Sequence, residues 1–225
     1  MEIRLRLMSN KLPFFHLVRK SNLKNGKSPL ILMIHGYGSN EQDLFSFSRA
    51  IPENFTIISL RGDIEFQYNE YAWYNIFWDY NGVKSYDIEK AKKSRDNILK
   101  SLDICKDLYE IDPDNITLMG FSQGAMLVNA VALTYPEKIN NIISLSGAFD
   151  PYIINLSNSK YLKKLSFYIS HGLNDEILPF DFSKKSLKIL DDNNLNYIFE
   201  EYPIGHTVSP DNFKSMLNWL IEKTN

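Results

Sequence analysis

The fold is decided by the stretch Ile116-Thr117-Leu118-Met119-Gly120-Phe121-Ser122-Gln123-Gly124. It begins as an apolar run of strand length, and the residues after Gly124 continue as an apolar, helix-like segment to about Tyr135. A Gly-x-Ser-x-Gly pentapeptide between a strand and a helix is typical of a sharp turn with the serine at its apex. The residues two before and two after the serine must be small, because the turn brings the helix and strand backbones together. We therefore predict a strand, turn and helix centred on Ser122; the alternative is a Gly-rich turn with an idle serine.

Strand-like and helix-like segments alternate along the rest of the chain. The predicted strands are Leu30–Ile34, Phe55–Leu60, Ile142–Leu145, Leu165–Ser170 and Tyr197–Tyr202, and the other predicted helices are 85–109, 182–192 and one beginning at Pro210 after Ser209 as N-cap. Continuous apolar runs such as Leu30–Ile34 are typical of central parallel strands. The alternation predicts a mostly parallel, doubly wound α/β sheet.

Both ends of this sheet carry further expectations. Ile3, Leu5 and Leu7 alternate with charged residues, which predicts an N-terminal strand, and the run Phe14–Val18 is expected to pair with it antiparallel at the sheet edge. About 19 residues separate the strands that end near Leu145 and begin near Leu165, which is too few for a large lid domain.

The composition is that of a globular chain. The 225 residues are 44% hydrophobic and 23% charged, with a formal net charge of −2, so a disordered chain is excluded and no nucleic-acid partner is indicated. The length predicts a single domain over residues 1–225. No segment approaches the roughly 20 apolar residues of a membrane span, so we expect no stable membrane insertion.

The single cysteine bears on the cellular compartment. Cys105 cannot form an internal disulfide, and an unpaired thiol suits a reducing compartment. The N-terminus lacks a hydrophobic run of signal-peptide length, so a cytoplasmic protein is expected. Cys105 shares one stripe of the predicted helix 85–109 with Ile98 and Leu102, which indicates a core residue and not a nucleophile.

A serine hydroxyl becomes a good nucleophile only when a base accepts its proton, so Ser122 requires a histidine. Three of the four histidines have other expected places: His16 lies in the N-terminal strand, His35 precedes a Gly-rich turn, and His171 closes a strand. His206 follows the last strand, where a loop can bring its imidazole over Ser122. We predict His206 as the base.

The base in turn needs an acid. Asp175 lies in the segment 171–179, at the carboxyl end of the strand Leu165–Ser170, and active sites of open α/β sheets form at that edge. The order Ser122, Asp175, His206 is the hydrolase order. Asp150, after the preceding strand, is the alternative acid, and the adjacent Glu176 would have to point the other way.

A tetrahedral intermediate needs two backbone N–H donors for its oxyanion. Gln123, the residue after the nucleophile, is expected to supply one. The turn His35-Gly36-Tyr37-Gly38 follows the strand Leu30–Ile34, so the N–H of Tyr37 is the expected second donor and His35 is expected to brace the turn. No Gly-x-Gly-x-x-Gly or phosphate-loop pattern accompanies this turn, which argues against a phosphate cradle.

A stretch rich in aromatic residues shows neither helical nor strand periodicity. It contains Tyr68, Tyr71, Trp73, Tyr74, Phe77, Trp78 and Tyr80. Two interpretations remain open: a loop lining an apolar acyl or alcohol pocket, with Trp73 and Trp78 as substrate-binding residues, or a buried aromatic cluster that packs the loop on the sheet.

Together these motifs resemble the phospholipase/carboxylesterase family of α/β-hydrolases, which includes acyl-protein thioesterases and small bacterial carboxylesterases. The matching segments, from about residue 31 to the C-terminus, are 35–38, 72–76, 120–124, 171–179 and 205–206. The chain departs from the family pattern with Tyr74 in place of the usual Phe, Asn75 in place of Asp and Ala125 where a further Gly is frequent. These departures concern the substrate pocket and leave the mechanism intact.

The resemblance implies an α/β-hydrolase fold and a serine carboxylesterase that cleaves small-molecule acyl esters or thioesters through a Ser-His-Asp triad and an acyl-enzyme. It implies no cofactor and no metal. The same triad also serves peptidases and acyltransferases, which remain alternatives, as does a non-catalytic ligand-binding protein. A homodimer is compatible with the sequence and not required by it.

Overall fold

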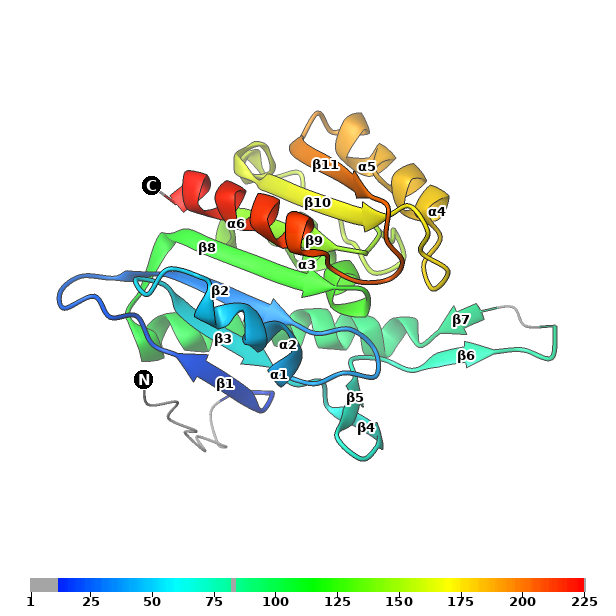
Figure 1. The fold of residues 1–225 in the computed structure, drawn as a ribbon, viewed down its shortest axis with the longest axis horizontal. Helices are drawn as coiled ribbons and strands as arrows, with labels where there is room; N and C mark the ends of the chain where they lie inside the picture. Colours follow the sequence, from blue (N-terminus) through cyan, green and yellow to red (C-terminus); the bar gives the residue numbers. More distant parts are fainter. Residues whose placement is uncertain (1–11, 82–83, 225) are drawn as a thin grey trace.

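A central seven-stranded sheet forms the body of the molecule (Figure 1). The computed structural model describes residues 12–81 and 84–224, and the predicted strand at residues 3–7 lies outside them. The strand order is β1-β3-β2-β8-β9-β10-β11. The strands are β1 (His16–Arg19), β2 (Ser28–Ile34), β3 (Thr56–Leu60), β8 (Ile111–Phe121), β9 (Asn141–Leu145), β10 (Ser166–Gly172) and β11 (Asn196–Tyr202).

Six of the strands are parallel, and only β1 is antiparallel, on β3 at one edge of the sheet. The predicted mostly parallel sheet with an antiparallel edge is therefore confirmed. The register pairs Ile34 with Gly120 and Phe121 with Leu145, so β2, β8 and β9 end at the same level. The loops that follow these strands consequently meet at one edge of the sheet, where ligands bind in open α/β folds.

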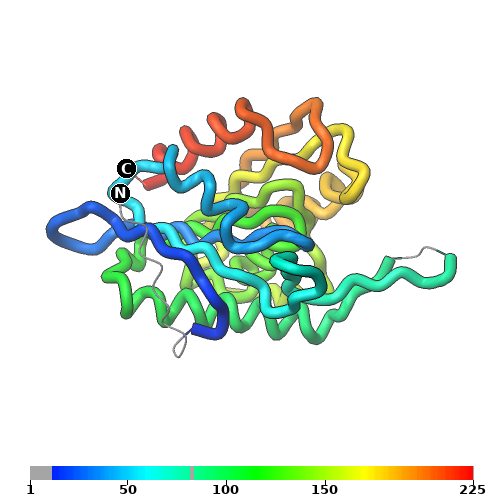
Figure 2. Tube along the Cα trace, turned by 60° about the horizontal axis from the view of Figure 1, so that its bottom comes forward, coloured from blue at the N-terminus to red at the C-terminus, as the bar shows by residue number. Residues whose placement is uncertain are grey.

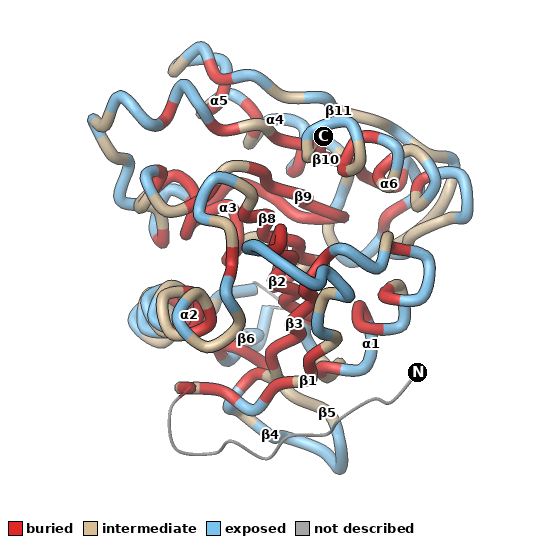
Figure 3. The backbone as a smooth tube through the Cα atoms, turned by 90° about the vertical axis from the view of Figure 1, so that its left-hand side faces the viewer, coloured by how far each residue is buried: buried red, intermediate tan, exposed pale blue. Residues whose placement is uncertain are grey.

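Helices cover both faces of the sheet. They are α1 (Gln42–Phe45), α2 (Ile88–Tyr109), α3 (Gln123–Thr134), α4 (Phe180–Ser186), α5 (Lys188–Asp192) and α6 (Pro210–Thr224), with short 3₁₀ turns η1 (Ser46–Arg49), η2 (Pro136–Lys138) and η3 (Lys160–Lys164). The face of α2 and α3 and the face of α1 and α6 each hold a hydrophobic cluster. The segments buried deepest are the central strands (Figure 3).

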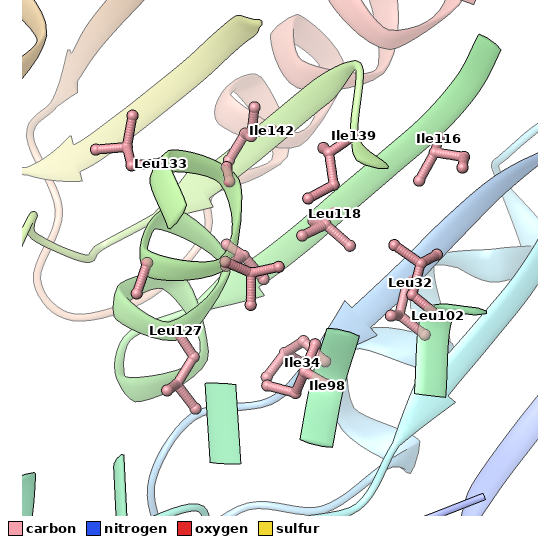
Figure 4. Close-up of a cluster of buried hydrophobic side chains, with 14 of the residues drawn as sticks. Leu32, Ile34, Ile98, Leu102, Ile116, Leu118, Leu127, Leu133, Ile139 and Ile142 are labelled. Carbon is pink, nitrogen blue, oxygen red and sulfur yellow. The ribbon is translucent and has the colours of Figure 1, made fainter. Parts of the chain in front are cut away.

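Alternation along β2 explains why both faces are apolar. Leu32 and Ile34 pack with Ile98 and Leu102 of α2 in one cluster (Figure 4), whereas Met33 points into the cluster on the other face. All seven residues of β2 are buried, and five of them form the apolar run Leu30–Ile34 that predicts a central strand. Fully burying each such side chain contributes about 1.5–3 kcal/mol, so this strand and the helices on it hold the edge on which the site is built.

Several boundaries differ from the expected ones. Helix α2 begins at Ile88 and not near residue 85, because Lys84–Tyr86 pair with another strand and Asp87 caps the helix by accepting a hydrogen bond from the Lys90 N–H at 2.9 Å. The predicted helix 182–192 is divided into α4 and α5. The expected N-cap Ser209 is confirmed, since its Oγ accepts from the Asn212 N–H at 3.2 Å.

The aromatic stretch folds into two hairpins. One consists of β4 (Ile64–Gln67) and β5 (Glu70–Ala72), and the other of β6 (Ile76–Trp78) and β7 (Lys84–Tyr86). The β6–β7 hairpin projects far from the body of the molecule (Figures 1 and 2). The connection from β9 to β10 holds only η3 among its helices, so no large lid domain is inserted there.

The structure bears on two expectations from the composition, the burial of Cys105 and the absence of a membrane-spanning helix. Cys105 is fully buried in the α2 face of the core, and burial raises the pKa of its thiol to about 12, so it is a core residue as predicted. Among the described residues, no helix has the length and apolar character needed to cross a membrane.

Candidate active site

Ser122 occupies a strained turn between β8 and α3. Its φ of 52° and ψ of −116° lie outside the regions that side-chain-bearing residues normally adopt. A Cβ at Gly120 would lie 2.4 Å from the Gly124 carbonyl oxygen, and a Cβ at Gly124 would lie 2.0 Å from the Ile34 carbonyl oxygen. Both glycines are therefore required by the close approach of helix and strands, as the pentapeptide predicts.

The loop between β11 and α6 brings His206 to Ser122. The His206 Nε2 lies 2.8 Å from the Ser122 Oγ, and its Nδ1 lies 2.6 Å from the Asp175 Oδ2. The imidazole also packs against the Phe121 ring, with 4.9 Å between centroids. A carboxylate can only accept, so Nδ1 carries the proton and Nε2 is free to accept from the serine hydroxyl. The three residues predicted as nucleophile, base and acid thus lie in one hydrogen-bonded line.

Asp175 is held by its own loop. The carboxylate is buried, and its Oδ1 accepts hydrogen bonds from the backbone N–H groups of Ile177 at 2.9 Å and Leu178 at 2.8 Å. These two bonds leave Oδ2 directed at the imidazole. The turn at residues 175–178 therefore fixes the orientation of the carboxylate.

The alternative acid has other partners. Asp150 accepts a short hydrogen bond from the Tyr86 hydroxyl and another from the Tyr152 N–H at 2.9 Å, and none from His206. Glu176 is exposed. The geometry consequently favours Asp175 over both alternatives.

Sequence reasoning missed one member of this cluster, His171. We expected it only to close a strand, but its Nε2 lies 2.8 Å from the Leu178 carbonyl oxygen and 3.2 Å from the Asp175 Oδ2. The available signal was its position near the carboxyl end of β10, four residues before Asp175. From this position His171 contacts the carboxylate of Asp175.

The turn predicted to complete the oxyanion site lies against Ser122. A Cβ at Gly36 would be 3.4 Å from the Ser122 Cβ. The turn is tied to the β4–β5 hairpin, because the Gly38 N–H donates to the Tyr71 carbonyl at 3.0 Å and the Tyr71 N–H donates to the Ser39 carbonyl at 2.8 Å. The N–H of Gln123 opens α3 and has no intrahelical acceptor. The two predicted donors, Tyr37 and Gln123, therefore belong to adjoining segments beside Ser122.

His35 braces this turn. It is fully buried, its Nδ1 lies 2.7 Å from the Gly36 carbonyl oxygen, and its Nε2 accepts from the Gly62 N–H at 3.0 Å. Burial lowers the pKa of His35 to about 4 from its ordinary 6.5, so the imidazole is neutral at neutral pH. These contacts agree with the predicted bracing role.

An ion pair between Glu41 and Arg61 lies next to the hairpin that holds the turn. Glu41 is buried, and its Oε1 accepts from the Arg61 Nη2 at 2.6 Å. The guanidinium lies between two rings, 4.3 Å from the Phe15 centroid and 4.6 Å from the Tyr71 centroid. Because Tyr71 pairs with the turn, this clamp fixes the hairpin that carries it.

The two tryptophans predicted to bind substrate differ in their surroundings. Trp73 is fully buried, its indole Nε1 donates to the His35 carbonyl at 2.9 Å, and its backbone N–H donates to the Gln123 side chain at 2.9 Å. Contact between Trp73 and a substrate would require the turn to move, and its bonds instead hold the turn to α3. Trp78 lies on the projecting hairpin and is 60% exposed.

Comparisons with known proteins show what the chain is similar to. A family model described as phospholipase/carboxylesterase matches residues 20–224. Acyl-protein thioesterase 1 of Aspergillus fumigatus is 32% identical over 60% of this chain and 61% of its own length. A probable SOBER1-like carboxylesterase of Arabidopsis thaliana is 30% identical over 50% of this chain and 44% of its own length. The chain thus spans less than two thirds of both relatives.

A solved structure supports the fold independently. The Bacillus cereus carboxylesterase superposes with a TM-score of 0.79 at 21% identity, covering 94% of this chain and 95% of its own. At this identity, the likeness concerns the fold.

Proposed function

Because the chain belongs to the phospholipase/carboxylesterase family, we propose that it is a serine hydrolase of carboxylic esters and thioesters. The observation that carries the proposal is the continuous line of hydrogen bonds from Ser122 through His206 to Asp175. The names of the relatives, carboxylesterase and acyl-protein thioesterase, support the same substrate class.

In the proposed reaction, the Ser122 Oγ attacks the acyl carbonyl carbon while His206 Nε2 takes the hydroxyl proton. Asp175 holds the imidazole in the tautomer that accepts at Nε2 and stabilises the imidazolium once it forms. The imidazolium then gives its proton to the leaving alkoxide or thiolate, which departs as an alcohol or thiol. An acyl-enzyme remains, and a water activated by the same imidazole hydrolyses it.

We assign the oxyanion of the tetrahedral intermediate to the backbone N–H groups of Tyr37 and Gln123. Donors fixed in advance cost no reorganisation when charge develops, and losing one such donor costs about 10²–10³ in kcat. Their segments are joined through Trp73, which bonds to the His35 carbonyl and the Gln123 side chain. The proposed hole is therefore a single braced unit.

The test compares Ser122→Ala with Ser59→Ala. Ser59 is a buried serine of β3 whose Oγ has no partner in the described structure, which makes it a matched control. Hydrolysis of p-nitrophenyl acetate and labelling by a fluorophosphonate should both vanish in Ser122→Ala, with kcat lower by roughly 10⁶, and persist in Ser59→Ala. Unchanged hydrolysis by Ser122→Ala would refute the proposal.

Substrate range is tested with the native protein. A panel of p-nitrophenyl esters and acyl thioesters of rising chain length reports the depth of the acyl site, and an aminoacyl anilide reports amide cleavage. We expect turnover of esters and thioesters far above that of the anilide. A preference for the anilide would indicate a peptidase.

We further propose that residues 1–225 form one domain and that the protein acts in the cytoplasm. The central seven-stranded sheet and the hydrophobic clusters on its two faces support the first statement. The lone buried thiol of Cys105 supports the second, because it has no cysteine to pair with.

A further inference from the structure

His171 has a defined protonation pattern. Its side chain is fully buried, and its Nε2 lies between two acceptors, the Leu178 carbonyl oxygen and the Asp175 Oδ2. Neither oxygen can donate, so Nε2 carries the ring proton. Nε2 donates to the Leu178 carbonyl at 2.8 Å, and the Asp175 Oδ2 lies 3.2 Å from the same nitrogen. The Nδ1 is then an acceptor, and it is buried without a hydrogen-bond partner in the described structure.

The ring acts as a neutral donor. Burial lowers the pKa of His171, and the titratable groups that face it are Asp175 and His206, on its two flanking loops. A protonated ring at this place would neutralise the carboxylate that the base needs. A neutral N–H 3.2 Å from Oδ2 instead stabilises the carboxylate electrostatically without cancelling its charge.

Packing alone does not explain this residue. A buried acceptor without a donor costs free energy, so a side chain kept only to fill space next to Phe180 would be aliphatic or aromatic without ring nitrogens. The free-energy cost of the unpaired Nδ1 must be offset by the interactions of the opposite ring nitrogen. That nitrogen, Nε2, contacts both the Leu178 carbonyl oxygen and the Asp175 Oδ2.

Two hydrogen bonds and one close contact link His171 and the acid loop in a closed circuit. The Leu178 N–H donates to Asp175 Oδ1, the Leu178 carbonyl accepts from His171, and His171 reaches Asp175 Oδ2. We propose that His171 is a positioning residue for the acid of the triad: its Nε2–H closes the loop 175–178 and keeps Oδ2 aimed at the His206 Nδ1. This inference rests on the proposed function, since Asp175 has this task only if Ser122 is the nucleophile.

Two amide variants separate the donor from the bulk of the ring. In His171→Gln, the amide nitrogen reaches the place of Nε2 and can donate to both acceptors. In His171→Asn, the amide lies near the place of Nδ1, where no partner exists. Both are polar and uncharged, and thermal unfolding with near-ultraviolet circular dichroism verifies that each is folded.

With p-nitrophenyl acetate, we expect His171→Asn to lower kcat about tenfold or more with KM within about twofold, because a misaligned acid slows the proton transfer and leaves substrate binding intact. His171→Gln should restore kcat to within about threefold of the native value. The acidic limb of the pH–rate profile should move to lower pH in His171→Asn only, since a misaligned carboxylate stabilises the imidazolium less.

A second measurement does not depend on hydrolysis. The proton between His206 Nδ1 and Asp175 should give a far-downfield resonance in the native protein and in His171→Gln, and this resonance should shift upfield or broaden in His171→Asn. The inference is overturned if both variants keep the native kcat and resonance, if both lose them equally, or if the acidic limb moves to higher pH. A native protein that shows the resonance but neither hydrolyses esters nor reacts with a fluorophosphonate would contradict the proposed function and not the placement of His171.

Discussion

The buried His35 makes folding stability depend on pH in a way that can be calculated. Its pKa falls from 6.5 to about 4 on folding, so the folded protein binds its proton less readily than the unfolded chain. The contribution of neutral His35 to the free energy of unfolding is complete above about pH 6.5. It is lost as the pH falls toward 4, where His35 of the folded protein begins to protonate. Between about pH 7.5 and pH 5, the loss amounts to about 2 kcal/mol of unfolding free energy.

The assay is equilibrium unfolding in urea at these two pH values, with His35→Gln as the comparison. A glutamine can accept from the Gly62 N–H but does not titrate, so the contributions of His16 and His171, whose pKa values burial also lowers, cancel in the difference. The native protein should lose about 2 kcal/mol more than the variant. Equal losses in the two proteins would refute the neutral, buried state of His35.

Three further predictions concern the site and its surroundings. Asp175→Asn should lower kcat for ester hydrolysis by about 10⁴, because the amide favours the wrong imidazole tautomer. Asp150→Asn should change kcat less than about tenfold, and equal effects of the two substitutions would contradict the assignment of Asp175 as the acid. Gly124→Ala should yield little folded protein, because its Cβ would lie 2.0 Å from a carbonyl oxygen of β2, whereas Gly205→Ala, with 3.6 Å to its nearest carbonyl, should express normally; soluble yield and circular dichroism decide. Trp78→Ser should leave the thermal midpoint unchanged and raise KM for long-chain esters several-fold; an unaltered chain-length profile would remove this residue from the substrate site.

The central strands, and the close approach of Ser122, His206 and Asp175, could be predicted because their determinants are local. A strand buried on both faces is mostly apolar, as the run Leu30–Ile34 of β2 is, and the turn at Ser122 requires its glycines because helix and strand backbones approach closely there. The base followed by elimination, since His206 alone stood after the last strand. The acid required only that Asp175 lie at the end of β10, which the parallel order of the sheet ensures.

The parts that escaped prediction depend on contacts between distant segments. The pairing of Phe77 with Ser85 that creates the β6–β7 hairpin leaves no periodic pattern in so short a strand, and it moves the start of α2. Trp73 could not be assigned to the core from its neighbours, because the groups it bonds, on the His35 turn and on α3, lie far away in sequence. The role of His171 also escaped prediction, because its contact with the Leu178 carbonyl oxygen depends on how the loop after β10 folds.

The order along the chain of the segments that meet at the sheet edge also determines when the proposed site is assembled during synthesis. A ribosome releases the turn at 36–39 first, then Ser122, then Asp175 and finally His206, with α6 following to seat the last loop. Until that loop docks, the nascent chain carries a serine without a base. Under the proposed function, the growing polypeptide is therefore expected to be inert toward esters throughout most of its translation, and reactivity is expected only after the loop between β11 and α6 has docked.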